Sequence, residues 1–360
     1  SVLAELQRSQ VISRIWDRDH TVWNPEHTEI SNRLGWLTVT DTIAGQLADL
    51  EALGRDVRDA GVRHVVVLGM GGSSLGPEVL RQSFGSAPGY SELIVLDSTD
   101  PDWVGSVADT INPAHTVFIV SSKSGSTTEP NMFYAYFRNL VEKSVGPDRA
   151  GQHFIAVTDP GTTLEKMAKD QGFRRVFANP ADIGGRYSVL SYFGLVPAAL
   201  VGLDLVMLLA RADGMRSGCG SDVPAHENPG AWLGAVMSVL ALQGRDKLTL
   251  VSSPSIKSFG LWAEQLLAES TGKEGKGIVP IANEPLVSPE HYGNDRLFIY
   301  LRLEGDENEE TDAALTALGD ARQPVVRLNL ADNYDLGAEF FRWEMGTAIA
   351  GAILGINPFD

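Results

Sequence analysis

The sequence predicts an α/β protein made of two doubly wound domains, each with a mostly parallel sheet flanked by helices. Short β-branched runs alternate with helical periodicity along most of the chain, which is the pattern of βαβ units. These runs fall into two series, separated over residues 203–230 by an apolar helix and a loop rich in Gly, Ser and Pro. A chain of 360 residues is long enough for two such domains without disulfide bonds to stabilise them.

Four predicted strands form the first series and three form the second. They cover residues 64–69, 93–97, 116–121 and 153–158, and then 247–252, 296–301 and 324–329. Helical segments lie between them, for example over 76–83, 131–143 and 232–243. We expect an N-terminal arm or linker with local helix over 1–30, a first domain over 31–215 and a second over 216–360. Ligands of such folds bind at the carboxyl ends of the strands.

The composition restricts the partners of the protein. The chain has 29 Lys and Arg against 46 Asp and Glu, a net charge of −17, which disfavours nucleic acid or an anionic membrane as a partner. The single cysteine, Cys219, excludes a disulfide within the chain and fits the cytoplasm. The apolar stretch 192–210 contains Pro197 and Asp204, so we expect a buried helix there and not a membrane span.

An acidic run, EGDENEETD, covers residues 304–312 and contains six carboxylates. Such a run could hold a metal ion. It is more typical of a solvated loop that leads into a helix, because acids in the first turn of a helix interact favourably with its dipole. We therefore expect no metal site.

The first candidate phosphate loop follows strand 64–69 and reads GMGGSSLGPE, residues 69–78. Glycines let a backbone approach a ligand closely, and the free amides at the start of a helix favour an anion. A tight βα turn without a ligand is an equal alternative. A dinucleotide fingerprint is a second one, although the position of its third glycine holds Ser74; Asp97 would then bind the ribose.

The second candidate loop, SSKSGSTTEP over 121–130, lies between strand 116–121 and helix 131–143. Five hydroxyls, one glycine and one lysine occupy seven of its residues. Hydroxyls and amides together can form many hydrogen bonds to one tetrahedral anion. The alternative is an N-cap, with Thr127 or Thr128 as the capping residue and Glu129 in the first turn, but it would use only one or two of the hydroxyls. We therefore expect this loop to bind phosphate.

Two further segments carry side chains suited to catalysis. Arg186 lies in GGRYS, residues 184–188, where the glycine pair allows a tight fold that points the guanidinium inward to stabilise an oxyanion. Gln265 and Glu269 are four residues apart near the end of a predicted helix over about 260–270, so they share a face. A carboxylate there could serve as a general base, but a surface glutamate is an open alternative.

Together these segments resemble the phosphoglucose isomerase family, in order and in spacing. The matching motifs are GMGGSSLGPE (69–78), SSKSGSTTEP (121–130), GGRYS (184–188), AEQLLAESTGK (263–273) and the ending FFRWEMGTAIAGAILGINPFD (340–360). The resemblance covers roughly residues 30–360. It implies two flavodoxin-like sugar-isomerase (SIS) domains, usually in a homodimer. It also implies the interconversion of glucose 6-phosphate and fructose 6-phosphate through a cis-enediol, without metal or cofactor.

The resemblance also assigns roles to residues. Glu269 would move the proton between C1 and C2, Arg186 would stabilise the enediolate, and Gln265 would lie beside the substrate. The phosphate would be held by Ser122, Lys123, Ser124 and Thr127, and the sugar would be lined by Gly71, Gly72 and Ser73.

Several features depart from the family pattern. The histidine expected to assist ring opening does not follow Glu269 in register, so His291 is the only downstream candidate. The family's late lysine is expected after the NPFD segment. Gly125 and Ser126 replace Phe and Thr of the family's loop, which could extend activity to mannose 6-phosphate. The segments RIWDRDHTVW (14–23) and EISNRLGWL (29–37) are similar to the junction of fused transaldolase/phosphoglucose isomerases, which would imply a fused or separate transaldolase.

Two other functions are compatible with parts of the pattern. A non-catalytic SIS module that senses a sugar phosphate needs the serine-rich loop but not Glu269 with Arg186. A nicotinamide dehydrogenase would use the first loop and has no role for the second. The presence of all four motifs favours the isomerase.

Overall fold

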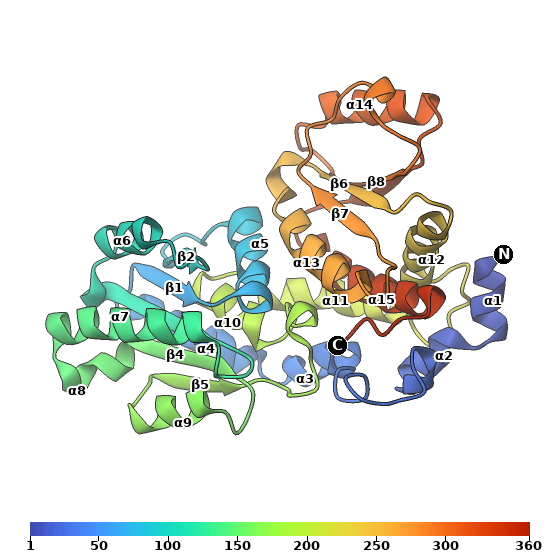
Figure 1. The fold of residues 1–360 in the computed structure, drawn as a ribbon. Coiled ribbons are helices and arrows are strands. Elements are labelled where there is room, and N and C mark those ends of the chain that lie inside the picture. Colours follow the sequence, from blue (N-terminus) through green and yellow to red (C-terminus); the bar gives the residue numbers. More distant parts are fainter. The chain divides into compact units, whose positions relative to one another are not determined.

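Two parallel β-sheets form the framework of the protein, whose computed structural model describes residues 1–360 (Figure 1). The chain divides into two compact units: Thr38–Val206, which we call the inner unit, and Ser1–Leu37 together with Met207–Asp360, which we call the split unit. The α/β fold with parallel sheets flanked by helices is confirmed. None of the helices combines the length and the apolar character needed to cross a membrane.

The inner unit has a five-stranded parallel sheet in the order β2-β1-β3-β4-β5. Its strands are β1 (His64–Leu68), β2 (Glu92–Leu96), β3 (Thr116–Ser121), β4 (Phe154–Thr158) and β5 (Arg175–Ala178). Its α-helices are α3 (Val39–Ala44), α4 (Leu47–Asp59), α5 (Leu75–Phe84), α6 (Pro101–Thr110), α7 (Thr128–Val145), α8 (Pro147–Ala150), α9 (Thr163–Asp170) and α10 (Tyr192–Leu200). Short 3-10 helices are η3 (Gly71–Ser73), η4 (Pro113–His115), η5 (Gly151–His153) and η6 (Gly185–Tyr187).

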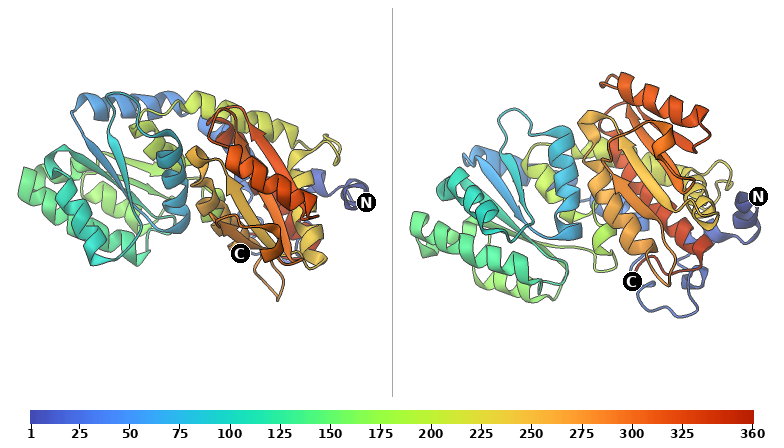
Figure 2. Two further views of the ribbon diagram at one scale, coloured as in Figure 1. Left: turned by 90° about the horizontal axis from the view of Figure 1, so that it is seen from above. Right: turned by 45° about the horizontal axis from the view of Figure 1, so that its top comes forward.

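Helices cover both faces of this sheet, as the views of Figure 2 show. Phe118 of β3 packs in one apolar cluster with Phe137 of α7 and Leu164 of α9. Val117 and Ile119 point to the opposite face and are equally buried, and α10 contacts β1 and β4. Burial on both faces explains why these strands read as nearly continuous apolar runs in the sequence.

The split unit has a four-stranded parallel sheet in the order β7-β6-β8-β9. Its strands are β6 (Lys247–Ser252), β7 (Val279–Ala282), β8 (Arg296–Leu303) and β9 (Val325–Leu330). Its α-helices are α1 (Val2–Arg8), α2 (Val11–Trp16), α11 (Leu205–Gly218, which begins at the boundary), α12 (Pro229–Leu242), α13 (Phe259–Thr271), α14 (Glu309–Asp320) and α15 (Asp335–Leu354). Its 3-10 helices are η1 (His20–Val22), η2 (Gly35–Thr38), η7 (Pro254–Ile256) and η8 (Pro289–His291).

The N-terminal segment is part of the split unit and not a separate arm. The indole N–H of Trp16 donates to the carbonyl of Cys219 at 2.8 Å, and that of Trp23 donates to the carbonyl of Ala348 at 2.8 Å. Ile15 is fully buried. The compact units therefore begin and end elsewhere than the domains expected at 30/31 and 215/216, because residues 1–37 bury apolar surface against a part of the chain far away in sequence.

The acidic run leads into a helix, as the charge pattern indicates. Glu309, Glu310 and Asp312 lie in the first turn of α14, and the Asp312 carboxylate pairs with Arg302 at 2.9 Å and Arg327 at 3.3 Å. The hydrogen bond and charge of Arg302 lower the pKa of Asp312. The structure holds no group of three or more His, Cys, Asp or Glu side chains suited to a metal ion.

Candidate functional site

The serine-rich loop connects β3 to α7 at the carboxyl end of the inner sheet. The hydroxyls of Ser122 and Thr127 lie 3.0 Å apart, and those of Ser124 and Thr127 lie 3.5 Å apart. Ser126 donates to the Ser124 hydroxyl at 3.0 Å. Four hydroxyls thus converge next to the start of an 18-residue helix, where the positive end of the dipole favours an anion.

Thr127 is the N-cap residue of α7, but its side chain makes no capping hydrogen bond. Its hydroxyl faces Ser122 and Ser124 instead, and Thr128 lies inside the helix. N-capping of α7 therefore does not explain these hydroxyls. Those of Ser122 and Ser124 accept instead from the N–H groups of Gly125 (3.1 Å) and Ser126 (3.2 Å), and their own protons stay available to a ligand. The backbone N–H groups of Lys123 and Ser124 donate to no acceptor of the chain. The loop presents donors without partners beside the helix start, which is what a phosphate group requires.

Gly125 gives this loop its shape. Its φ is +66°, and a Cβ atom there would lie 2.8 Å from Cβ of Thr162 and 3.0 Å from Cβ of Leu164. The loop therefore packs against the start of α9, and a side chain at this position would force the two segments apart.

The ammonium group of Lys123 does not point to the converging hydroxyls, where a phosphate ligand would be expected. The ammonium pairs with the carboxylate of Asp159 and donates to the carbonyl of Ala181 at 3.0 Å. Asp159 follows β4 directly, so this pair joins the loops after two neighbouring strands. Asp159 was not among the residues expected from the sequence. The available signal was its place after an apolar strand, at the sheet edge where ligands bind.

The glycine-rich loop lies next to the serine-rich loop. Its residues Gly71–Ser73 form η3, with Gly71 at φ +54°, and the Ser121 hydroxyl donates to the Ser73 carbonyl at 3.3 Å. Since β1 and β3 are adjacent and their connections leave in opposite directions, the two loops meet at the topological switch point of the sheet. Ser74, which replaces the third glycine of a dinucleotide fingerprint, is fully buried and bonds to the Gly71 carbonyl.

The Arg186 loop packs against Gly72. A Cβ atom on Gly72 would lie 2.2 Å from the carbonyl oxygen of Gly185, so only glycine permits this contact. The Ser188 hydroxyl bonds to the carbonyls of both Gly185 (2.6 Å) and Gly72 (3.4 Å). Arg186 itself lies in η6 and is partly buried. The inner unit therefore brings together three of the four motifs.

The fourth motif lies in the split unit. Gln265 and Glu269 share one face of α13, and the Gln265 amide donates to the Glu269 carboxylate at 2.8 Å. Both line a cleft of about 850 Å³ beside the edge strand β7. Glu269 is exposed, so a ligand in the cleft can reach its carboxylate. Lys276 lines the same cleft and was not expected from the sequence.

His291 lies away from that cleft lining. It ends η8, is exposed, and its Nδ1 lies 3.0 Å from the Ser288 hydroxyl. The structure does not bring it together with Gln265 and Glu269.

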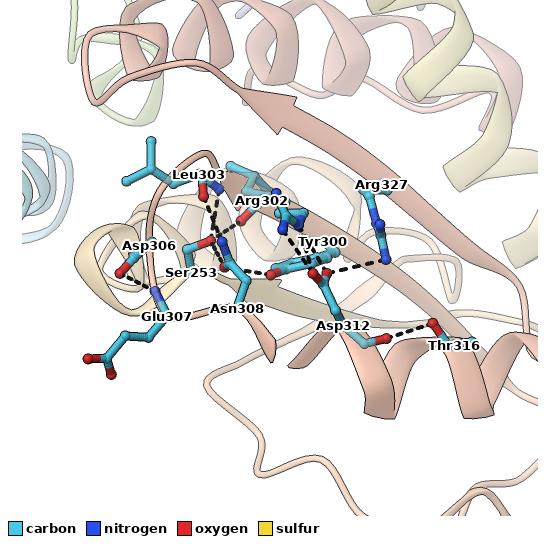
Figure 3. A network of polar contacts seen from close by, with 11 residues as sticks. Ser253, Tyr300, Arg302, Leu303, Asp306, Glu307, Asn308, Asp312, Thr316 and Arg327 are labelled. Carbon is cyan, nitrogen blue, oxygen red and sulfur yellow. Dashed lines mark hydrogen bonds and ion pairs between the residues drawn. The ribbon is translucent and has the colours of Figure 1, made fainter. Parts of the chain in front are cut away.

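A network of polar side chains lies beside the switch point of the second sheet, between β6 and β8 (Figure 3). Asn308 accepts hydrogen bonds from Ser253 (2.6 Å) and Tyr300 (2.8 Å), and it donates to the carbonyl of Leu303 (2.7 Å). Ser253, Tyr300 and Asn308 are all buried. These buried polar groups therefore satisfy one another within the network.

Cys219 is chemically quiet. It is buried, and burial raises the pKa of its thiol to about 11, so the nucleophilic thiolate is scarce at neutral pH.

Comparisons with known proteins identify the family of the chain. The family model described as Phosphoglucose isomerase matches residues 52–278, more than half of the chain. The glucose-6-phosphate isomerase of Rubrobacter xylanophilus is 31% identical, over 87% of this chain and 82% of its own. That of Staphylococcus saprophyticus is 29% identical, over 92% and 84%.

Solved structures share the fold. A hypothetical protein from Thermus thermophilus matches with a TM-score of 0.83 at 24% identity, over 100% of this chain and 92% of its own. A glucose-6-phosphate isomerase from Chlamydia trachomatis matches with a TM-score of 0.75 at 21% identity, over 98% and 75%. These structures show the fold alone, whereas the family model and the Rubrobacter relative show the family. The chain belongs to the phosphoglucose isomerase family.

Proposed function

We propose that this protein is a glucose-6-phosphate isomerase, which interconverts glucose 6-phosphate and fructose 6-phosphate without a metal or organic cofactor. The observation that carries the proposal is the cluster of converging hydroxyls and unpaired amide donors at the start of α7, beside the glycine-rich loop and the Arg186 loop, in a member of this family. The family match favours the isomerase over a nicotinamide dehydrogenase, which would leave the serine-rich loop without a role.

The phosphate of the substrate binds to the serine-rich loop in this proposal. The hydroxyls of Ser122, Ser124 and Thr127 donate to its oxygens, and so do the N–H groups of Lys123 and Ser124. The Lys123 ammonium acts indirectly, by holding the loop to Asp159. Gly71, Gly72 and Ser73 line the sugar.

The chemistry is a proton transfer between neighbouring carbons. Glu269 takes the proton from C2 of the open-chain aldose, and the C1 carbonyl oxygen becomes the oxyanion of a cis-enediolate. The proton returns to C1, while the hydroxyl proton on O2 moves to O1, so the ketose forms with no net change in protons. The Arg186 guanidinium offsets the negative charge on the oxygens, and Gln265 orients the Glu269 carboxylate. His291 does not line the cleft of Glu269, so it has no part in this proton transfer, and its role in ring opening stays a prediction from the sequence.

Glu269→Gln tests the assignment of the base. We expect the wild type to convert fructose 6-phosphate to glucose 6-phosphate in an assay coupled to glucose-6-phosphate dehydrogenase at 340 nm. The variant should lose roughly 10²–10⁴-fold in kcat, because the amide cannot accept the proton. Glu309→Gln, an exposed glutamate in the first turn of α14, is the matched control and should turn over like the wild type.

A folded wild type that binds fructose 6-phosphate but does not convert it would favour the sugar-phosphate-binding module instead. Conversion of mannose 6-phosphate in the same assay format would extend the substrate range. We further propose that the protein is a cytoplasmic homodimer, as the resemblance implies. Light scattering, which gives the mass in solution, tests the dimer. The relationship of this chain to isomerases fused to a transaldolase stays a prediction, which rests on residues 14–37.

A further inference from the structure

Lys276 lies in the loop of residues 272–277 and caps the C-terminal end of α15. Its ammonium donates to the carbonyl oxygens of Leu354 at 2.8 Å and Gly355 at 3.4 Å. Leu354 is the last residue of α15, and Gly355 is its left-handed C-cap. The last carbonyls of a helix have no partner within the helix and carry the negative end of its dipole, so a cation is favourable there. Lys276 thereby ties this loop to α15.

Lys273, in the same loop, holds the segment that follows α15. Its ammonium donates to the carbonyl oxygens of Asn357 at 2.7 Å and Asp360 at 3.0 Å, and it also pairs with the Asp360 carboxylate. That segment is itself anchored, since Phe359 packs edge-on against Trp23 with ring centres 4.9 Å apart. We call Lys273, Lys276 and these acceptors the lysine clamp.

The loop of residues 272–277, which carries both lysines, is held to the end of α13 by close contacts at its two ends. The Thr271 hydroxyl donates to the Leu267 carbonyl at 2.7 Å and accepts from the Ile278 amide at 2.9 Å. Across the loop, a Cβ atom on Gly277 would lie only 3.1 Å from Cα of Gly272. These contacts connect the loop that carries the lysines to the last turn of α13, where Glu269 lies.

We propose that the lysine clamp positions Glu269 for proton transfer. Glu269 lies two residues before the end of α13, on its exposed side, and shares the 850 Å³ cleft with Lys276. The ammonium groups contact backbone carbonyls of the C-terminal segment, so Lys273 and Lys276 are positioning residues and not catalytic ones. The inference rests on the proposed isomerase function, in which Glu269 is the base.

Lys273→Met and Lys276→Met remove the ammonium groups while keeping most of the side-chain volume. We expect kcat for fructose 6-phosphate to fall on the order of 10- to 100-fold, because a misplaced reacting group costs rate in that range. KM should stay within about twofold of the wild type, since the phosphate-binding loop is untouched. The primary isotope effect on kcat with glucose 6-phosphate deuterated at C2, followed by NMR, should rise above the wild-type value.

The controls separate positioning from folding. Lys276→Arg retains a donor for the two carbonyls and should recover most of kcat. Lys257→Met removes the same charge from an exposed lysine that forms no ion pair, and it should behave as the wild type. Circular dichroism and the thermal midpoint establish that each variant is folded.

The outcomes distinguish this inference from the function it rests on. If the wild type isomerises and Glu269→Gln does not, while both methionine variants keep the wild-type kcat and isotope effect, the clamp has no positioning role. A loss of thermal stability with kcat unchanged likewise leaves the clamp a purely structural contact. If Glu269→Gln keeps its turnover, the base assignment fails and the proposed function must be revised first.

Discussion

Glu344 carries a carboxyl group that has no hydrogen-bond partner inside the protein. Glu344 belongs to α15, and both of its carboxyl oxygens are buried. This burial raises the pKa of Glu344 well above the ordinary value of a glutamate. The folded chain therefore keeps a proton on this group at pH values where the unfolded chain has lost it. Because the unfolded state then binds fewer protons, this group's contribution to stability is lost as pH rises through its pKa in the folded state.

Glu344→Gln, which keeps the shape and cannot ionise, should remove this dependence. The free energy of unfolding of the variant, relative to wild type, should grow between pH 5 and pH 8. The slope reaches about 1.4 kcal/mol per pH unit where only the unfolded chain is ionised. Urea unfolding at several pH values measures it, with exposed Glu310→Gln as control. A difference that stays constant with pH would show that Glu344 is not buried as a neutral acid.

Lys123 shows where reasoning from a motif stops. Its place in a serine-rich loop after a strand predicts a phosphate ligand, and the loop's hydroxyls do gather as that reading requires. The ammonium, however, is taken by Asp159, which lies 36 residues further along the chain. The partner of a flexible side chain depends on which strand is the neighbour in the sheet, and the sequence does not state the strand order.

The conformation of the serine-rich loop depends on Gly125. This residue has a left-handed backbone and also packs closely against the start of α9. Gly125→Ala should weaken inhibition by inorganic phosphate and raise KM for fructose 6-phosphate, at a cost in stability of at least roughly 1–2 kcal/mol from the left-handed backbone alone. Gly172→Ala, at φ +65° with no atom within 4 Å of the new Cβ, carries the backbone strain without the clash.

The inhibition constants for phosphate and the urea midpoints of the two glycine variants separate the effect of the clash from that of backbone strain. Equal effects on phosphate binding would mean that the packing of the loop against α9 does not shape the anion site.

The sequence pattern predicts seven of the nine strands and misses β5 and β7. Both have four residues and lie at a sheet edge. β5 begins with an exposed arginine, and β7 contains Pro280 and the exposed Val279. A strand of four residues offers only a short pattern. At a sheet edge it can also contain an exposed charge, as β5 does, or a proline, as β7 does, and both argue against a strand in the sequence.

Across the whole molecule, the N-terminal segment is a structural part of the split unit. Trp23 is nearly buried, donates to Ala348 and packs against Phe359. Trp23→Ala should lower the free energy of unfolding by about 3–5 kcal/mol, the range for large buried aromatic side chains. Denaturant unfolding measures it against Trp103→Ala, an exposed tryptophan of the inner unit, which should change little. If both substitutions changed the free energy of unfolding equally little, residues 1–30 would be an arm that adds little to the stability of the split unit.

The order of motifs along the chain is sufficient to predict the α/β class, the serine-rich loop and the isomerase family, because each of these depends on residues that are neighbours in sequence. The placement of residues 1–37, the pairing of Lys123 with Asp159 and the lysine clamp are visible only in the folded chain. Each joins positions between 36 and more than 300 residues apart. Such contacts follow from strand order and helix packing, which the local pattern of polar and apolar residues does not encode.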